Sequence, residues 1–76
     1  MKEVIIYSTS TCKYCDIAKN YFKANEIEFI EYNVGTDIEA RKEMMDRSGQ
    51  MGVPVIIIDN EIIVGFDKEK IEKLAK

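Results

Sequence analysis

Two cysteines separated by two residues are the side chains in this sequence best suited to covalent chemistry. Cys12 and Cys15 follow a short apolar run and precede a segment with helical spacing. A Cys-X-X-Cys pair can bind a metal, form a structural disulfide or carry out thiol–disulfide exchange. A bridge across two residues closes a very small loop and constrains little of the unfolded chain, so a purely structural role explains the pair poorly.

The sequence contains no histidine and no third cysteine. Cys–His nucleophilic catalysis and histidine-containing zinc sites are therefore excluded. Two cysteines alone also cannot complete a tetrahedral four-sulfur zinc site within one chain. Thiol–disulfide exchange and binding of Cu(I), which soft thiolates suit, stay open.

The pattern of apolar residues places the cysteines between a strand and a helix. Lys2 to Tyr7 is short and rich in β-branched residues, which predicts a buried strand. From Lys13 to about Asn25 the apolar residues recur at helical spacing. The residues left for solvent on this helix are Asp16, Lys19, Asn20 and Lys23. Ile27 to Tyr32 predicts a second strand.

The next segment predicts a second helix. Thr36 and Glu39 fit a capping box, and Gly49 suits the end of the helix. Its apolar face would consist of Ile38, Met44 and Met45.

The last third of the chain predicts a hairpin and a final helix. Val55 to Ile58 and Ile62 to Val64 would pair across a tight turn at Asp59–Asn60. Asp67 would cap the last helix. The inner face of that helix would consist of Ile71, Leu74 and Ala75.

The predicted order is therefore β-α-β-α-β-β-α. The first β-α-β unit favours a parallel strand pair with a right-handed crossover, and the hairpin adds antiparallel strands. We expect an α/β fold of the thioredoxin-like class, a four-stranded mixed sheet flanked by three helices. With 76 residues, one domain should span positions 1–76.

Composition narrows the classes of partner and the compartment. The formal charge is −3, and no basic patch suggests nucleic-acid binding. The apolar runs are too short to cross a bilayer, and the first residues lack the features of a signal peptide. We expect a cytoplasmic monomer that binds neither nucleic acid nor membrane. A static disulfide is disfavoured in that compartment.

Position makes the two cysteines unequal. Cys12 would lie at a helix N-terminus, where free N–H groups and the helix dipole stabilise an anion. Cysteines in such motifs have pKa values of roughly 3.5–7.5, against about 8.5 for a free thiol. Lys13 adds a positive charge, so Cys12 would be the nucleophile. Cys15, nearly one turn later, would be more buried and would resolve the mixed disulfide. Tyr14 would offer aromatic surface to a partner.

Three stretches together resemble the glutaredoxin family along essentially the whole chain: "TCKYC", "SGQMGVPVIII" and "VGFD". The resemblance implies a thioredoxin fold and thiol–disulfide oxidoreductase activity on protein or glutathione mixed disulfides. It makes Cys12 the nucleophile and Cys15 the resolving cysteine. The residues expected to bind substrate or glutathione are Lys13, Tyr14, Val53, Pro54, Gly65, Phe66 and Asp67. Val53 would precede a cis Pro54, and Asp67 would lie near the γ-glutamyl end of glutathione. No permanently bound cofactor or metal is expected, and glutathione would be a co-substrate.

Departures from the family pattern leave the electron donor open. Thr9 stands where glutaredoxins usually place a lysine or arginine for the glycyl carboxylate of glutathione, and Gly52 precedes Val53 where threonine is usual. The cations that could compensate are Lys13, Arg41, Arg47 and Lys68. The departures point toward glutaredoxin-like redoxins reduced by thioredoxin reductase, such as the hydrogen donors of ribonucleotide reductase. Glutathione and thioredoxin reductase therefore both remain as donors.

Two metal-related alternatives also remain. Small copper carriers place Cys-X-X-Cys between a first strand and a first helix, but their β-α-β-β-α-β order would require a strand within residues 36–50. They also typically have methionine two residues before the first cysteine, where Ser10 stands. An iron–sulfur carrier is better matched by glutaredoxins with a single active cysteine.

Overall fold

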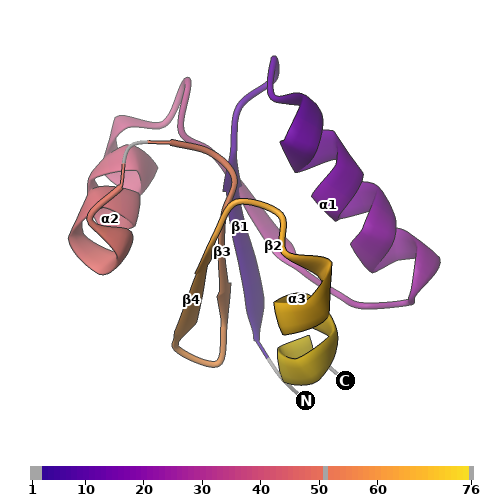
Figure 1. Ribbon diagram of the computed structural model, residues 1–76. Helices are drawn as coiled ribbons and strands as arrows, with labels where there is room; N and C mark the ends of the chain where they lie inside the picture. The colour runs from indigo at the N-terminus through magenta and orange to yellow at the C-terminus, as the bar shows by residue number, and fades with distance from the viewer. Residues whose placement is uncertain (1–2, 51, 76) are drawn as a thin grey trace.

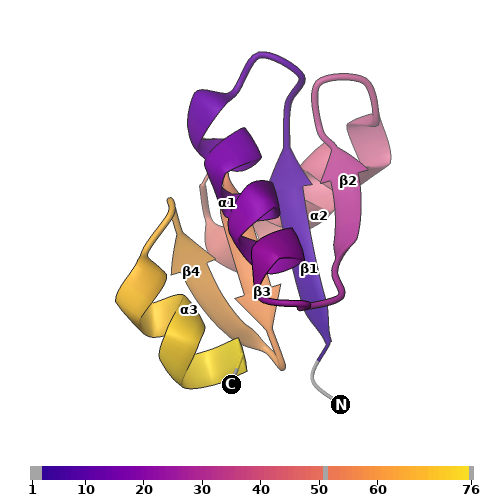
Figure 2. The same ribbon diagram turned by 90° about the vertical axis from the view of Figure 1, so that its right-hand side faces the viewer.

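Four strands form one mixed sheet with helices on both faces (Figure 1). The computed structural model describes residues 3–50 and 52–75. The elements, in chain order, are β1 (Val4–Ser8), α1 (Lys13–Ala24), β2 (Ile30–Asn33), α2 (Ile38–Ser48), β3 (Val55–Ile58), β4 (Glu61–Val64) and α3 (Lys68–Ala75). Helices α1 and α3 cover one face, and α2 covers the other, as Figures 1 and 2 show. The predicted β-α-β-α-β-β-α order is confirmed.

The strand order brings three loops to one end of the sheet. The order is β2-β1-β3-β4, with β1 parallel to β2 and antiparallel to β3, and β3 antiparallel to β4. Tyr7 near the end of β1 pairs with Val55 at the start of β3, and Val55 pairs with Val64 at the end of β4. The segments that follow β1, precede β3 and follow β4 therefore lie at the same end.

Alternating residues of the central strands fill two cores. Toward α1 and α3, the buried cluster contains Val4, Ile6, Ala18, Phe22, Ile56, Ile58, Ile63 and Ile71. Toward α2, it contains Ile5, Tyr7, Val34, Ala40, Met44, Val55 and Ile57. Because both faces are covered, β1 and β3 are buried at every position. This two-sided burial explains why their sequences are apolar runs rather than alternating patterns.

The start of α2 corrects one prediction. The N-cap is Asp37, whose Oδ1 accepts a hydrogen bond from the Ala40 N–H at 3.1 Å. The Thr36 hydroxyl instead lies 3.5 Å from the Asn33 carbonyl, so Thr36 and Glu39 do not form the predicted capping box. The Thr36 N–H also bonds to Asn33, which makes Thr36 part of the preceding turn.

The apolar face of α2 is narrower than predicted. Met44 is fully buried, but Ile38 is 64% exposed and Met45 is also exposed. Ala40 and Met44, spaced four residues apart, are the residues of α2 that are buried. The wider face predicted with Ile38 and Met45 is therefore wrong, because the helix presents a single narrow stripe to the sheet.

Other local predictions are confirmed. Gly49 ends α2 in the left-handed region with φ 68°, and the hairpin turn has positive φ at Asp59 and Asn60. Asp67 Oδ1 accepts from the Lys70 N–H at 3.3 Å and so caps α3. On α3, Ile71 is buried, and Leu74 and Ala75 pack against the same core.

The first two strands begin and end at different residues from those predicted. The first strand covers Val4–Ser8 rather than Lys2 to Tyr7, and Lys2 lies outside the described residues. The second covers Ile30–Asn33 rather than Ile27 to Tyr32. The Ile27 N–H donates to the Phe22 carbonyl at 2.8 Å, which holds this segment against the end of α1 and delays the strand.

Helix α2 also decides against the copper-carrier alternative, since it occupies positions where that fold needs a strand. Within residues 3–50 and 52–75, no three ligand-type side chains come together as a metal site. None of the described helices is long and apolar enough to span a membrane.

Candidate active site

The two cysteines lie at the end of the sheet where the three loops meet. Cys12 is the N-cap of α1, and Cys15 lies in its first turn. The structure joins them by a disulfide, with their Cα atoms 5.2 Å apart. Cys12 is partly exposed, whereas Cys15 is 0% exposed. A partner therefore has access to Cys12 and not to Cys15.

Cys12 takes the position that serine or aspartate commonly fills at a helix start. Its backbone is extended, and its Sγ accepts a hydrogen bond from the Cys15 N–H at 3.1 Å. The Cys12 N–H bonds to Thr9, and its carbonyl accepts the first helical bond from Asp16. A sulfur at this position faces the positive end of the helix dipole, which favours its thiolate form in the reduced protein.

The segment before β3 packs beside the segment after β4, at the same end of the sheet as the cysteines. The Val53–Pro54 peptide bond is cis, as the family resemblance implies, and Pro54 is buried. The Gly65 N–H donates to the Pro54 carbonyl at 2.8 Å. Gly65 has φ 84°, which side chains rarely tolerate. Phe66 follows and packs edge-on against Tyr21, with ring centroids 5.9 Å apart. Five of the predicted binding residues are thus brought together here, with Asp67 capping the adjacent helix.

The other two predicted binding residues lie on the first turn of α1. Lys13 and Tyr14 are exposed, and Tyr14 is exposed to 64%. The prediction of accessible aromatic surface beside Cys12 is confirmed. Contacts of these residues with a substrate stay predictions.

One of the four candidate cations, Arg41, is bonded to the loop that packs against Thr9. The Arg41 Nε donates to the Val34 carbonyl at 3.3 Å, and the Val34 N–H donates to Ser8, which directly precedes Thr9. A Cβ placed on Gly35 would come within 3.7 Å of the Thr9 side chain, so this loop lies against Thr9. Arg41 is therefore tied to the loop that packs against Thr9, the position where the family usually has a basic residue.

The sequence interpretation missed a polar network behind the cysteines. Lys19, assigned there to solvent, has a side chain that is only 20% exposed. Its Nζ donates to Glu31 Oε2 at 2.7 Å and lies 3.5 Å from Asp16. The hydroxyl of Ser8, a fully buried residue, donates to the same Glu31 oxygen at 2.8 Å.

The two charged partners shift each other's pKa. The hydrogen bond from Lys19, with that from Ser8, lowers the pKa of Glu31 below its ordinary value. The hydrogen bond to Glu31 raises the pKa of Lys19. One signal in the sequence could have revealed this pair: Lys19 follows Cys15 by four residues, so it borders the face of α1 that is buried.

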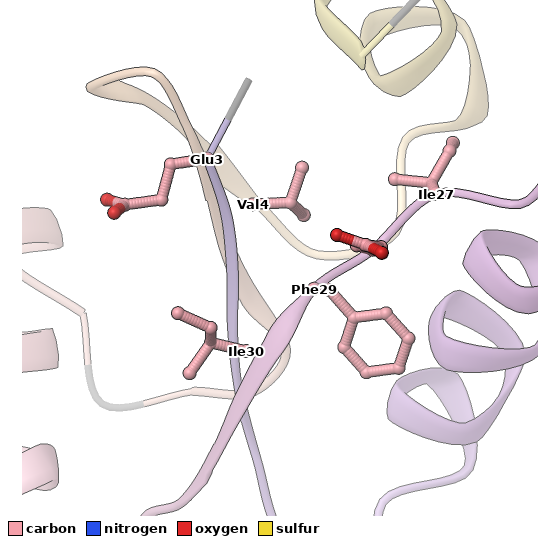
Figure 3. A pocket seen from close by; sticks show the side chains of 6 residues that line it. Glu3, Val4, Ile27, Phe29 and Ile30 are labelled. Carbon is pink, nitrogen blue, oxygen red and sulfur yellow. The ribbon is translucent and has the colours of Figure 1, made fainter. Parts of the chain in front are cut away.

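The pocket drawn in Figure 3 lies elsewhere. This cavity of about 520 Å³ is lined by Glu3, Val4, Ile27, Glu28, Phe29 and Ile30. These residues surround the start of β1 and the segment that enters β2, at the end of the sheet opposite Cys12 (Figure 2). The cavity therefore takes no part in dithiol chemistry.

Comparisons of the sequence and the structure with known proteins agree on one family. The family model described as Glutaredoxin matches residues 4–63. The chain belongs to the glutaredoxin family. Its thiol–disulfide oxidoreductase chemistry is that of the family, and the Cys12–Cys15 pair is its redox centre.

Individual relatives cover nearly the whole chain. A glutaredoxin-like 8.6 kDa protein of Clostridium pasteurianum, named as uncharacterized and from a rubredoxin operon, is 52% identical over 71 residues, which are 93% of this chain and 95% of that one. Glutaredoxin 3 of Escherichia coli K12 is 39% identical over 67 residues, covering 88% and 81%. The crystal structure of the thioredoxin-like protein BC3987 superposes with a TM-score of 0.89 at 29% identity, covering 95% and 99%. The thioredoxin-like fold class is thereby confirmed.

Proposed function

We propose that this protein reduces disulfides in proteins or in glutathione conjugates through a Cys12–Cys15 dithiol that turns over. The asymmetry of the pair carries the proposal. Cys12 is accessible, and its Sγ accepts the N–H of Cys15, whereas Cys15 is completely buried. Attack by the exposed thiolate and resolution by the buried thiol is the division of roles that this geometry supports.

The reaction would proceed in two exchanges. The Cys12 thiolate attacks one sulfur of the substrate disulfide, forms a mixed disulfide and releases the other sulfur as a thiolate. Cys15 then loses its proton to solvent and attacks Cys12, forming the Cys12–Cys15 disulfide and releasing the second substrate sulfur. Two protein thiols are oxidised, and one substrate disulfide is reduced.

The surface around Cys12 would bind the substrate. The backbone of Val53, before cis Pro54, would pair with the extended chain on either side of the substrate sulfur, and Lys13 and Tyr14 would border it. For glutathione, Gly65, Phe66 and Asp67 would meet the γ-glutamyl end. Arg41, bonded to the loop that packs against Thr9, would meet the glycyl carboxylate. A cytoplasmic location is part of this proposal, because a reducing compartment supplies the donor.

Trapping the mixed disulfide tests the assigned roles. We expect Cys12→Ser to abolish reduction of a disulfide substrate, and Cys15→Ser to accumulate one covalent adduct that mass spectrometry identifies on Cys12. An adduct on Cys15 in the Cys12→Ser protein, formed at the rate of the parent, would overturn the assignment.

The electron donor is tested separately. Oxidised protein is incubated with excess reduced glutathione, or with thioredoxin reductase and NADPH, and the appearance of thiols is followed. Thr9 favours the reductase, whereas the fixed Arg41 favours glutathione; we propose glutathione. Arg41→Gln should then slow reduction by glutathione about tenfold, as expected for one lost charge-assisted hydrogen bond. Lys42→Gln, at an exposed position of α2 that is not among the candidate cations, is the control. Reduction by the reductase alone would establish the glutathione-independent alternative.

A further inference from the structure

A partly buried cation lies one helical turn from the resolving cysteine. Residues four apart on a helix are neighbours on its surface, with Cβ atoms about 5–6 Å apart, so Lys19 adjoins Cys15. Long helical side chains lean toward the N-terminus. The 3.5 Å contact of Lys19 Nζ with Asp16 shows this lean, which carries the ammonium toward the turn that holds Cys15.

Glu31 of the sheet binds the ammonium directly, and Ser8 holds Glu31 in place. Ser8, at the end of β1, faces α1 from the same side of the sheet as Val4 and Ile6. Glu31 on β2 pairs in register with Ile6 and accepts hydrogen bonds from both Ser8 and Lys19. The cation is therefore fixed between the first turns of α1 and the end of the sheet, on the side where Cys15 is buried.

Resolution of the mixed disulfide requires the Cys15 thiolate, which burial disfavours. Cys15 must become a thiolate before it attacks, and a fully buried thiol resists ionisation. Once Cys12 is in a mixed disulfide, its sulfur is neutral. A nearby fixed cation would then stabilise the charge that forms on Cys15.

We propose that Lys19, held by Glu31 and Ser8, is a positioning residue that stabilises the Cys15 thiolate during resolution of the mixed disulfide. The inference rests on the proposed function. In the assisted step, the proton of Cys15 passes to solvent, the Cys15–Cys12 bond forms, and the bond from Cys12 to the substrate sulfur breaks. The substrate leaves as a thiolate and is protonated by water.

The charges that face this region have opposing effects on Cys15. The titratable groups at the N-cap and in the surrounding turns of α1 are Cys12, Lys13, Tyr14, Asp16, Lys19 and Lys23, and β2 contributes Glu31. On β1, Ser8 is the polar group, without charge. The start of α3 contributes Asp67 at the cap and Lys68 in the first turn, while Glu72 bonds to the Tyr21 hydroxyl further along α1.

Variants of Lys19 and Glu31 should change the Cys15 thiolate fraction in opposite directions, which distinguishes the proposed role from simple structural support. Lys19→Gln removes the cation and leaves Glu31, which disfavours the thiolate. Glu31→Gln removes the anion but keeps an amide oxygen that can accept the bond from Lys19, so the cation stays in place and favours the thiolate. Loss of structure alone would change both variants in the same direction.

The experiment titrates Cys15 directly. Cysteine labelled with ¹³C at Cβ is introduced into the reduced full chain with Cys12→Ser, so that Cys15 is the one thiol observed, and its chemical shift is followed with pH. We expect Lys19→Gln to lower the thiolate fraction at neutral pH about threefold and Glu31→Gln to raise it about threefold, as a charge several ångströms away in a partly screened site would do.

Matched variants complete the test. Lys23→Gln makes the same charge change at an exposed position of α1 and should alter the thiolate fraction by less than about 1.5-fold. Lys19→Arg keeps the charge and should restore the behaviour of the parent, which also covers a glutamine variant that folds poorly. Changes of the same sign in Lys19→Gln and Glu31→Gln, or an equal effect of Lys23→Gln, would overturn the inference. Trapping with Cys15→Ser leaves Lys19 and Glu31 in place, so its failure would instead refute the proposed function.

Discussion

Asp37 offers the sharpest test of how α2 begins. In Asp37→Ala, the Ala40 N–H loses the acceptor that now lies 3.1 Å away. The Asp37 side chain is exposed, so water replaces part of the lost bond. Removal of such a cap typically costs about 1 kcal/mol of unfolding free energy, of which about 0.3–1 kcal/mol is the interaction of the carboxylate with the helix dipole. For a domain of this size, about 1 kcal/mol lowers the Tm by about 4–8 °C.

Two further variants make this test specific. Thr36→Ala should change the unfolding free energy by less than about 0.5 kcal/mol, because Thr36 caps nothing. Asp37→Asn keeps an efficient cap and loses only the charge, so it should fall between the parent and Asp37→Ala. Urea and thermal unfolding, followed by circular dichroism with the disulfide formed in every sample, measure all three. A loss in Thr36→Ala equal to that in Asp37→Ala would refute the assignment of the cap.

Three other predictions concern packing, backbone conformation and pH. Met44→Ala should cost about 2–5 kcal/mol in urea unfolding, whereas Met45→Ala, on the exposed side of α2, should cost under about 1 kcal/mol; similar losses would contradict the narrow buried stripe. Gly49→Ala should cost about 1 kcal/mol, because φ is 68° there although the space is open, and an unchanged Tm would show that the helix end rearranges. The pKa of Glu31 is lowered from 4.5 and that of Lys19 is raised from 10.5, so the pair stabilises the folded state fully between these two values. This stabilisation is lost as pH falls through the lowered pKa of Glu31, and it is lost again as pH rises through the raised pKa of Lys19. The difference in unfolding free energy between the parent and Glu31→Gln is about 0.5 kcal/mol for a pair whose carboxylate is solvent-accessible. This difference should stay constant from about pH 5 to pH 9 and shrink below about pH 4. A difference that widens in acid would contradict the pairing.

The order of the helices and strands could be predicted because most of them have a clear local sequence pattern. The buried strands are apolar runs, α1 has a clear helical period, and Gly49 and Asp59–Asn60 mark a helix end and a turn through their backbone preferences. The unequal exposure of Cys12 and Cys15 also follows from one short stretch, since a helix start fixes both.

Features that depend on distant partners could not be predicted. Lys19 and Glu31 are 12 residues apart, and their contact depends on the parallel register of β1 with β2, which no local pattern encodes. Thr36 and Asp37 are both good caps, and the turn bond from Thr36 to Asn33 decides between them. The bond of Arg41 to the Val34 carbonyl likewise arises from how the loop after β2 folds back.

The burial of β1 and β3 along their full length determines which strands unfold first. Both strands are central, while β2 and β4 form the edges and carry exposed side chains. Backbone amides of Val4–Ser8 and Val55–Ile58 that bond within the sheet should therefore exchange with deuterium only when the whole domain unfolds, whereas edge amides should exchange through local fraying. The loops that carry Cys12 and Pro54 are attached to the slowest-exchanging strands, so the dithiol should remain assembled through every partial opening short of global unfolding.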